Sequence, residues 1–517
     1  MKRFLVLIFL LLSVRPVLAS EEFEISHQIE YLALASSRMR VSQKISLTNK
    51  LANVYATQYS IVLQEVKVQN VRAENSEGAL KTDVSQSGVE TIIRVNFDQP
   101  MVGKGKTLEF TLNYEALDLA QKNGQIWEIN IPKFSKQNPP DSLSLVLLVP
   151  TSFGQLAFLQ PEPISREERD NLRLYRFDKN QLLDKGVHAN FGEFQIFDFV
   201  LSYHLANNHN TRAETEIALP PDTAFQITNY TQIEPEPLSI RMDNDGNWLA
   251  KYRLKAREKL NIQAMGQVKI FSQPRSEFPK TGEDQLRKNL LAQDYWPIDD
   301  FEIKAKAQQL KTSRAIYDFV VEHLEYNFEK INDDSPRLGG LKALQNPKDA
   351  ICMEFTDLFV SLSRAAGIPA REINGFAYTT NVELKPLGLV TDILHAWPEF
   401  WDETKKAWIP VDPTWGKTTG GIDYFSKTDL NHFTFAIHGE DDEEPYPAGS
   451  YKTVDDFGKD VQVVFAQKLK QPKPELEILF DLPGSISIKN KGTGAFYNLE
   501  PKVESDTLTI NFKNPTS

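Results

Sequence analysis

The chain has almost no cysteine. Cys352 is the only one among 517 residues, so no disulfide can form within the chain. This absence excludes a small scaffold held together by disulfides, and the fold must depend on its hydrophobic cores. A hydrophobic fraction of 41% is typical of globular packing, and the length suggests three or four domains.

The sequence also lacks a long apolar run, because no segment reaches the roughly 18 apolar residues that a membrane span needs. The apolar segment 4–12 follows a basic tip and precedes Ala19, which is the pattern of a secretory signal. We expect residues 1–19 to be removed and the mature protein to be secreted or held in the cell envelope, without a transmembrane helix. An uncleaved anchor is the weaker alternative, since Arg15 and Pro16 interrupt the run.

A basic stripe is missing as well. The formal net charge is −12, and it becomes −15 when Lys2, Arg3 and Arg15 leave with the signal. Because nucleic-acid binding depends on clustered lysine and arginine, no nucleic acid is expected as a partner. The same charge disfavours tight adsorption to anionic lipid.

Motifs for metals and nucleotides are absent from the sequence. It contains no HExxH, CxxC or Walker-type loop, so neither a metal nor another cofactor is expected. The acidic run 440–444 lacks the glycine-punctuated alternation of a calcium loop, and a solvated surface loop is the favoured interpretation. Any chemistry is therefore expected to come from side chains alone.

The N-terminal half is rich in predicted strands. From residue 23 to about 270, apolar and polar residues alternate in short segments such as 38–49 and 126–131, and turn residues separate them. This texture indicates β-sandwich packing. We expect a β-sandwich domain over 20–160 and a second β-rich domain over 161–275, with a soft boundary where proline and charge accumulate.

Near residue 275 the pattern changes to helices followed by strands. Segment 301–328 carries an apolar stripe at helical spacing, formed by Ala315, Ile316, Phe319, Val320 and Leu324. A second helix is expected to begin at Cys352 and to end at a C-cap at Gly367. Strand patterns follow in 371–379, 395–403 and 407–415.

The predicted fold class is therefore multidomain. All-β sandwich domains at the N-terminus precede an α+β domain over 280–450. A short β segment over 455–517 follows, too short for a complete sandwich.

Cys352, His395 and Asp412 are the candidate catalytic residues. A thiol at a helix N-terminus lies beside unpaired N–H groups and the positive end of the helix dipole, which favours the thiolate. His395 and Asp412 fall in strand-like segments joined by a short loop, so the carboxylate can accept the Nδ1 proton of the imidazole. Taken singly, each has a plainer explanation: a buried thiol or one that pairs between chains, a structural histidine, and a turn residue.

Other residues near these blocks carry weaker signals. Trp397, Trp401, Trp408 and Trp415 fit a core, although one or two of them could line a groove for an acyl donor. His432 could reach the site after the Asp-Pro-Thr turn, but a structural role is favoured for it.

The blocks CMEFTDLFVSLSRAAGIPAREINGFAY, HAWPEFW and WIPVDPTW resemble the core of the transglutaminase-like superfamily. The resemblance covers about 310–435, roughly a quarter of the chain. It implies a papain-like core in which Cys352 is the nucleophile, His395 the base and later the acid, and Asp412 the carboxylate that orients the imidazole. One departure is Ala350, which stands where the family usually has a glycine.

The resemblance implies acyl transfer at a glutamine carboxamide or an amide bond of a protein or peptide, including a component of the cell envelope. An amine that resolves the thioester gives a crosslink, and water gives deamidation or proteolysis. The residues do not separate these outcomes, because all of them use the same triad. A thiol peptidase on the same core and a noncatalytic cell-surface binding scaffold are the alternatives.

Overall fold

The structure is a computed structural model that describes residues 22–513 except 100, 135–138, 184–185, 277, 279–280, 333–335, 380–381, 383–384, 388–393, 427–429, 452–457, 472, 474, 482–484, 493–496 and 505–506. The expected signal segment 1–19 lies outside the described residues. The chain divides into two compact units, which are described separately. The first consists of Met1–Gln121, Glu128–Phe153 and Leu159–Ala189, and the second of Lys122–Trp127, Gly154–Phe158 and Asn190–Ser517.

The first unit is built on a ten-stranded sheet with the order β12-β13-β10-β1-β2-β7-β4-β5-β6-β3. Apolar and polar residues alternate along its strands, so one face of the sheet is buried. In β2, for example, Met39, Val41 and Ile45 are fully buried while the residues next to them are more exposed. Strand β1 pairs antiparallel with β2 and parallel with β10. The strands are β1 (Phe23–Leu34), β2 (Arg38–Asn49), β3 (Gln58–Gln64), β4 (Val68–Asn75), β5 (Gly78–Ser87), β6 (Glu90–Asn96), β7 (Thr107–Ala116), β10 (Ser142–Pro150), β12 (Ser165–Arg169) and β13 (Leu172–Asp178).

A four-stranded sheet has the order β11-β14-β9-β8. Its strands are β8 (Ala120–Asn123), β9 (Ile126–Ile131), β11 (Leu156–Gln160) and β14 (Val187–Phe191). Two short helical turns, η1 (Thr151–Phe153) and α2 (Lys179–Leu182), complete the part of the chain before β15 that the structure describes.

The second unit contains three larger sheets, with the orders β17-β20-β15-β25, β16-β19-β18 and β23-β22-β21-β24. The strands are β15 (Phe194–Ala206), β16 (Ala213–Leu219), β17 (Gln226–Glu234), β18 (Ser239–Met242), β19 (Trp248–Leu254), β20 (Lys259–Phe271), β21 (Ala370–Ala377), β22 (Leu394–Asp402), β23 (Ala407–Pro410), β24 (His432–His438) and β25 (Val461–Phe465). Two hairpins follow, β26 (Leu476–Asp481) with β27 (Ser485–Asn490) and β28 (Tyr497–Glu504) with β29 (Thr507–Lys513).

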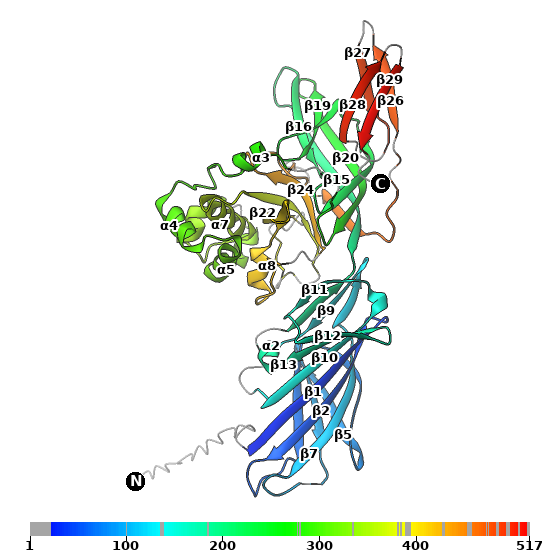
Figure 1. The fold of residues 1–517 in the computed structure, drawn as a ribbon, viewed down its shortest axis with the longest axis vertical. Coiled ribbons are helices and arrows are strands. Elements are labelled where there is room, and N and C mark those ends of the chain that lie inside the picture. The colour runs from blue at the N-terminus through cyan, green and yellow to red at the C-terminus, as the bar shows by residue number, and fades with distance from the viewer. Residues whose placement is uncertain are drawn as a thin grey trace, which may run out of the picture. The chain divides into compact units, whose positions relative to one another are not determined.

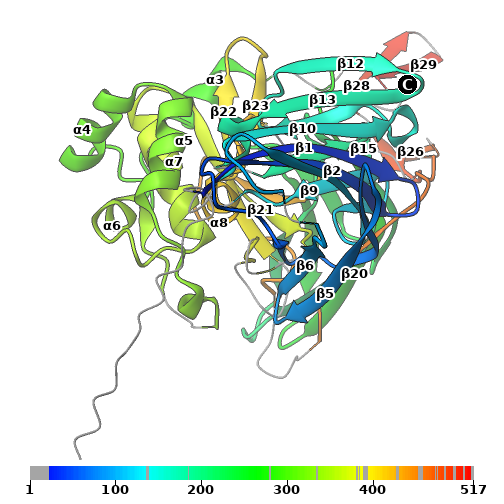
Figure 2. The same ribbon diagram turned by 90° about the horizontal axis from the view of Figure 1, so that it is seen from below.

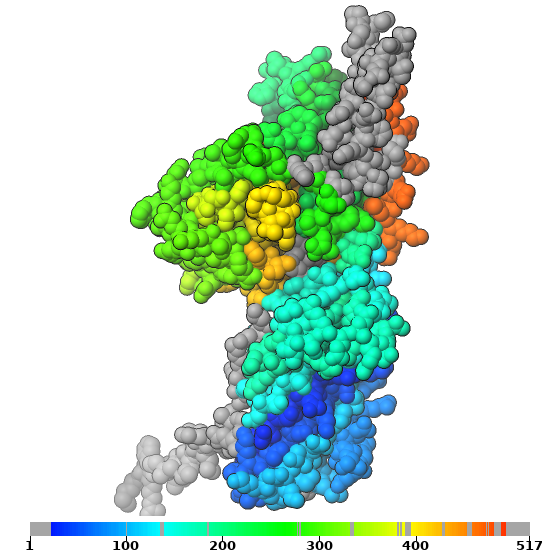
Figure 3. Space-filling view, viewed as in Figure 1, coloured from blue at the N-terminus to red at the C-terminus, as the bar shows by residue number. Residues whose placement is uncertain are grey.

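Helices lie between β20 and β21 and after β23. They are α3 (Glu283–Lys288), α4 (Phe301–Leu310), α5 (Ser313–His323), η2 (Phe328–Asn332), α6 (Gly339–Gln345), α7 (Cys352–Ala365) and α8 (Pro413–Thr418). In the space-filling view the helical layer forms a continuous green outer surface on its side of the unit (Figure 3).

The sheet β23-β22-β21-β24 is buried on both faces. Phe376 and Phe433 point into a core that includes Phe199 of β15. Phe400 points the opposite way and packs in a second core with Phe359 of α7. Helices α4, α5 and α7 therefore cover one face of the sheet, and the β15 layer covers the other (Figures 1 and 2). A strand buried on both faces is held rigidly, which suits a strand that carries a functional side chain.

The segment 301–328 forms two helices, not the one amphipathic helix that its apolar stripe predicts. Lys311 adopts a left-handed backbone with φ of 61°, which ends α4. The side chain of Thr312 then accepts a hydrogen bond from the N–H of Ala315 and begins α5. The stripe itself is placed correctly, since Ile316 and Val320 are fully buried.

The predicted fold class is confirmed: β-rich domains come first, an α+β core follows, and a short β segment ends the chain. The domain boundaries predicted at 160 and 275 stay predictions. Within the described part of the chain, no helix combines the length and the apolar character that crossing a membrane requires.

Gly375 of β21 is a position where only glycine fits. A methyl group there would collide with the carbonyl oxygen of Phe433 in β24 and with the ring of Trp397. We expect Gly375→Ala to lower the free energy of unfolding by about 1–3 kcal/mol, because β21 and β24 must separate to admit it. Gly282→Ala is the matched control, since nothing lies within 4 Å of the added group. Equal melting temperatures for the two variants would contradict this packing.

Candidate active site

Helix α7 places Cys352 at its first position, as the sequence predicts. The helix ends at Ala365, and Gly367 follows with φ of 80°, a backbone conformation that glycine adopts without strain. The first N–H groups of a helix have no partner within the helix, so the thiol lies beside unpaired donors. Cys352 is only 2% exposed.

Glu354 fixes the start of α7. Its carboxylate accepts the N–H of Ile351 at 2.9 Å and the N–H of Leu338 at 3.0 Å. A buried acid two residues after the thiol therefore ties the helix N-terminus to the segment that precedes α6. The alanine at position 350 does not disturb this turn, because Ala350 is fully buried and its carbonyl accepts the N–H of Asn327 at 2.8 Å.

His395 and Asp412 come from neighbouring strands, as predicted. His395 lies on β22, which pairs antiparallel with β23, and Asp412 follows β23 as the N-cap of α8. Pro413 at the first helical position favours this turn. The Oδ1 atom of Asp412 accepts the N–H of Trp415 at 2.9 Å, and Oδ2 lies 3.0 Å from Nε2 of His395. The turn role and the pairing with histidine thus use different oxygens of one carboxylate.

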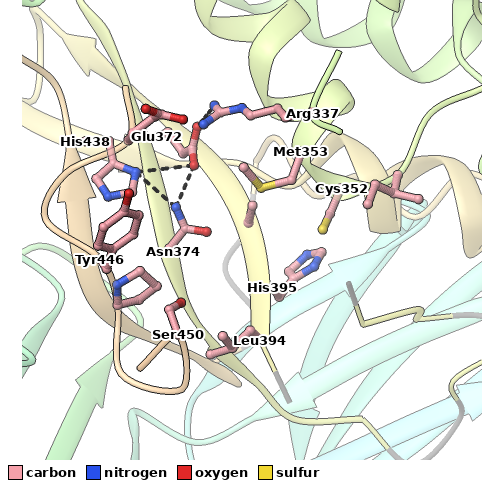
Figure 4. Close-up of a pocket in the computed structure, with 14 residues that line it drawn as sticks. Arg337, Cys352, Met353, Glu372, Asn374, Leu394, His395, His438, Tyr446 and Ser450 are labelled. Carbon is pink, nitrogen blue, oxygen red and sulfur yellow. Dashed lines mark hydrogen bonds and ion pairs between the residues drawn. The ribbon is translucent and has the colours of Figure 1, made fainter. Parts of the chain in front are cut away.

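The prediction that Nδ1 of His395 faces Asp412 is wrong, because Nε2 does. The carboxylate lies beyond the tip of the imidazole ring, where Nε2 is located. Among the described residues Nδ1 has no conventional hydrogen-bond partner. It is therefore the nitrogen left for Cys352, whose side chain lies beside the ring (Figure 4).

The pKa values of His395 and Asp412 are both strongly shifted. Burial alone would lower the pKa of His395, but the charge and hydrogen bond of Asp412, together with Cys352, raise it to about 9. Burial would raise the pKa of Asp412, yet His395 and then His432 lower it to about 2. At neutral pH the site therefore contains an imidazolium paired with a carboxylate.

Two tryptophans pack against the imidazole ring of His395. The ring of Trp415 stacks on His395 at 5.1 Å between centroids, and the ring of Trp397 stacks at 6.0 Å. The expectation that the tryptophans are largely core residues holds for all four, including Trp401 and Trp408, which are buried. Two of them also exclude water from the histidine.

His432 contacts the same carboxylate. Its Nε2 lies 3.3 Å from Oδ2 of Asp412, and its ring packs against Trp397 and Trp415 with centroid distances of 4.8 and 4.6 Å. His432 therefore reaches the site, as the sequence allowed, and the structural role favoured for it stays a prediction. Strand β24 brings it there by pairing with β21.

A cavity of about 280 Å³ opens beside Cys352 and His395. Met353 and Leu394 give it apolar walls, and Asn374 and His438 form a polar end (Figure 4). The buried thiol is thus reached through a space large enough for a side chain of a substrate.

A buried ionic cluster borders this cavity, and the sequence analysis did not predict it. Arg337 donates hydrogen bonds to Asp357 and Glu372, and Nδ1 of His438 lies 3.4 Å from Glu372. Burial opposes the charge on Arg337, but the two carboxylates raise its pKa above the ordinary value. These residues come from four separate segments, so no local pattern indicates their association. The one sequence signal for Asp357 and Glu372 is a charged residue within an apolar segment.

The acidic run is not simply a solvated loop. Asp441 and Glu444 are exposed, but Asp442 is only 7% exposed, and its side chain accepts the N–H of Tyr295 at 2.7 Å. Its carbonyl oxygen accepts a hydrogen bond from Arg337 at 2.7 Å. The surface-loop prediction is wrong for this residue, because long-range partners bury it.

Tyr326 is a further residue near the thiol, and no local sequence pattern indicates it. It forms a backbone bridge with Ala350, and its hydroxyl is buried without a hydrogen-bond partner in the described part of the chain. Burial, followed by the neighbouring Cys352, raises the pKa of this hydroxyl.

The geometry agrees with a comparison of sequence families. Residues 300–413 match the sequence model of the Transglutaminase-like superfamily, a range that includes Cys352, His395 and Asp412. This part of the chain is a transglutaminase-like domain. A search of curated proteins found no sequence that matches the chain.

Solved structures share weak similarity with the chain. One is a candidate cysteine protease from Cytophaga hutchinsonii, with 13% identity, coverage of 62% of this chain and 99% of the other, and a TM-score of 0.33. Another is the periplasmic domain of TgpA from Pseudomonas aeruginosa, with 15% identity, coverage of 44% and 91%, and a TM-score of 0.26. At such TM-scores these similarities carry no weight for the function of the transglutaminase-like domain.

The acidity of His395 gives a direct test of this geometry. Its raised pKa means that the ion pair stabilises the transglutaminase-like domain fully below pH 6.5, and that this stabilisation is lost as the pH rises through about 9. For Asp412, whose pKa is lowered from 3.8, the stabilisation is present above that pH and is lost as the pH falls through about 2.

We therefore expect the imidazole resonances of His395 in an NMR titration to move near pH 9. In Asp412→Asn the carboxylate is removed, so the midpoint should fall below that of the wild type. An unchanged midpoint in Asp412→Asn would contradict the pairing.

The ionic cluster predicts a large difference between two arginines. Arg337→Met leaves Asp357 and Glu372 buried without their partner, so we expect a loss of about 3–5 kcal/mol in the free energy of unfolding. Arg241→Met removes an ion pair from an arginine whose side chain is 55% exposed, so it should cost less than about 1 kcal/mol. Similar melting curves for the two variants would contradict a structural role for the cluster.

Proposed function

We propose that the transglutaminase-like domain is a cysteine acyltransferase that acts on a glutamine carboxamide or an amide bond. Cys352 is the nucleophile, His395 the proton donor and acceptor, and Asp412 the group that orients the imidazole. The observation that carries the proposal is the placement of His395, which is engaged by Asp412 at 3.0 Å and lies beside Cys352 under two tryptophan rings.

In the first step the thiolate of Cys352 attacks the carbonyl carbon of the amide. A C–S bond forms, and the charge moves to the oxygen, where N–H groups at the N-terminus of α7 can stabilise it. His395 then gives its Nδ1 proton to the leaving nitrogen, the C–N bond breaks, and ammonia or an amine departs. The product of this step is a thioester on Cys352.

In the second step an acceptor resolves the thioester. A neutral amine or a water molecule attacks the carbonyl carbon while Nδ1 of His395 takes its proton. The C–S bond breaks and the thiolate returns. An amine gives an isopeptide crosslink, and water gives deamidation or cleavage.

The proposed substrate is a protein or peptide, including components of the cell envelope. The cavity beside Cys352 is sized for a side chain, and its partly apolar walls suit the methylene groups of a glutamine. The proposed location outside the cytoplasm is supported by the signal pattern of residues 1–19.

The proposal is tested with the chain beginning at Ser20 and glutamine-containing peptides, with and without a primary amine. Wild type should release ammonia and, with the amine, form a product whose mass shows replacement of NH₃ by the amine. Cys352→Ala should abolish both reactions, and His395→Ala should lower the rate about 10²–10⁴-fold. Cleavage fragments in place of transfer products would identify a thiol peptidase.

Alkylation of Cys352 distinguishes a protein that does not accept the chosen peptides from one in which His395 does not activate the thiol. We expect iodoacetamide at pH 6 to modify Cys352 faster in wild type than in His395→Ala, because a neighbouring imidazolium favours the thiolate. His323→Ala is the matched control, since His323 bonds to the carbonyl of Leu344 away from the site. Equal rates in all three proteins, without peptide turnover, would point to a binding scaffold and would overturn the proposal.

A further inference from the structure

Three side chains converge behind the imidazole ring of His395. Nε2 of His395 lies 3.0 Å and Nε2 of His432 lies 3.3 Å from the same oxygen, Oδ2 of Asp412. The donor atoms of all three residues lie within 4.8 Å of one another. Two imidazole nitrogens and a carboxylate oxygen are a common ligand set for zinc.

We propose that His395, Asp412 and His432 form a binding site for a zinc-like divalent cation. Zinc binds imidazole nitrogen at about 2.0–2.1 Å and carboxylate oxygen at about 2.0–2.2 Å, so tetrahedral coordination places donor atoms roughly 3.3 Å apart. The two distances to Oδ2 are close to this value.

The residues around these three side chains fix their orientation, as the residues that contact metal ligands do in metalloproteins. The N–H of Trp415 donates to Oδ1 of Asp412, which leaves Oδ2 directed toward the two histidines. Trp397 and Trp415 pack against both imidazole rings and limit their rotation. Fixed ligand orientation is what such partners provide in zinc proteins.

The site also has space beside it. The side chain of His432 is 11% exposed, and a cavity of about 20 Å³ adjoins it. A cavity of this size holds one water molecule, which suits a site with three protein ligands and one open position.

The position of the site relative to the thiol distinguishes it from a metal bound by the nucleophile. The ligand atom of His395 is Nε2, whereas Cys352 lies beside the ring with Nδ1 left to it. A cation at Nε2 would displace the hydrogen bond to Asp412 without using the sulfur. The expected consequence, loss of acyl transfer on zinc binding, rests on the proposed function, but the binding itself does not.

Binding is measured by calorimetric titration of the full chain beginning at Ser20 with ZnCl₂, in wild type, His432→Gln, Cys352→Ser and His323→Gln. We expect one high-affinity zinc ion in wild type and the same affinity in Cys352→Ser. His432→Gln should weaken binding at least tenfold, because changes to outer partners alone cost about 10–100-fold. His323→Gln, the same substitution away from the site, should leave the affinity unchanged.

Two results would overturn the proposal. One is loss of binding in Cys352→Ser with full affinity in His432→Gln, which would place the metal on the sulfur. The other is the absence of high-affinity binding in wild type.

Cobalt gives a test that needs no folded variant of His432. Wild type loaded with Co²⁺ should show visible bands of tetrahedral cobalt without a thiolate charge-transfer band in the near ultraviolet. A thiolate band would show that Cys352 is a ligand and would contradict the proposed site.

Discussion

The buried contact between His395 and Asp412 is the interaction on which the site depends. Neither residue is stable as a charged group in a core without the other, because burial alone would neutralise both. Together they keep an imidazolium and a carboxylate at neutral pH, as the opposite shifts of their pKa values to about 9 and about 2 indicate. The acidity of the site is therefore a property of the pair.

The rest of the domain places this pair next to a thiol. Because the sheet of β21 to β24 is covered on both faces, close packing holds β22, which carries His395, against α7. At the other end of the cavity, Arg337 is bonded to Asp357 of α7 and Glu372 of β21, so it links the helix that carries Cys352 to the sheet that carries His395. The precision of the site thus comes from layers joined by apolar cores and one ionic cluster.

Local signals made the positions of Cys352, His395 and Asp412 predictable from the sequence. Cys352 precedes an amphipathic pattern that ends at Gly367, and these signals define α7 without any tertiary information. His395 and Asp412 lie on either side of a short turn, so their proximity follows from strand pairing.

The other features of the site depend on contacts between segments that are distant in the sequence. His432 reaches Asp412 only because β24 pairs with β21, and which nitrogen of His395 meets the carboxylate depends on the placement of α8. Charge and proline also accumulate at residues 161–170, where the domain boundary stays a prediction. This segment contains β12, an exposed strand at the edge of a sheet, and such strands carry charge for their own reasons.

Nucleophilic catalysis by Cys352 is tested by measuring the mass of the protein itself during turnover. Wild type is mixed with glutamine-containing peptides, quenched in acid within the first turnovers and analysed as intact protein and as fragments. We expect an adduct on Cys352 equal to the peptide mass less one ammonia, and we expect it to be absent from Cys352→Ala. An adduct that persists in Cys352→Ala, or turnover that proceeds with an unmodified Cys352, would contradict nucleophilic catalysis by this thiol.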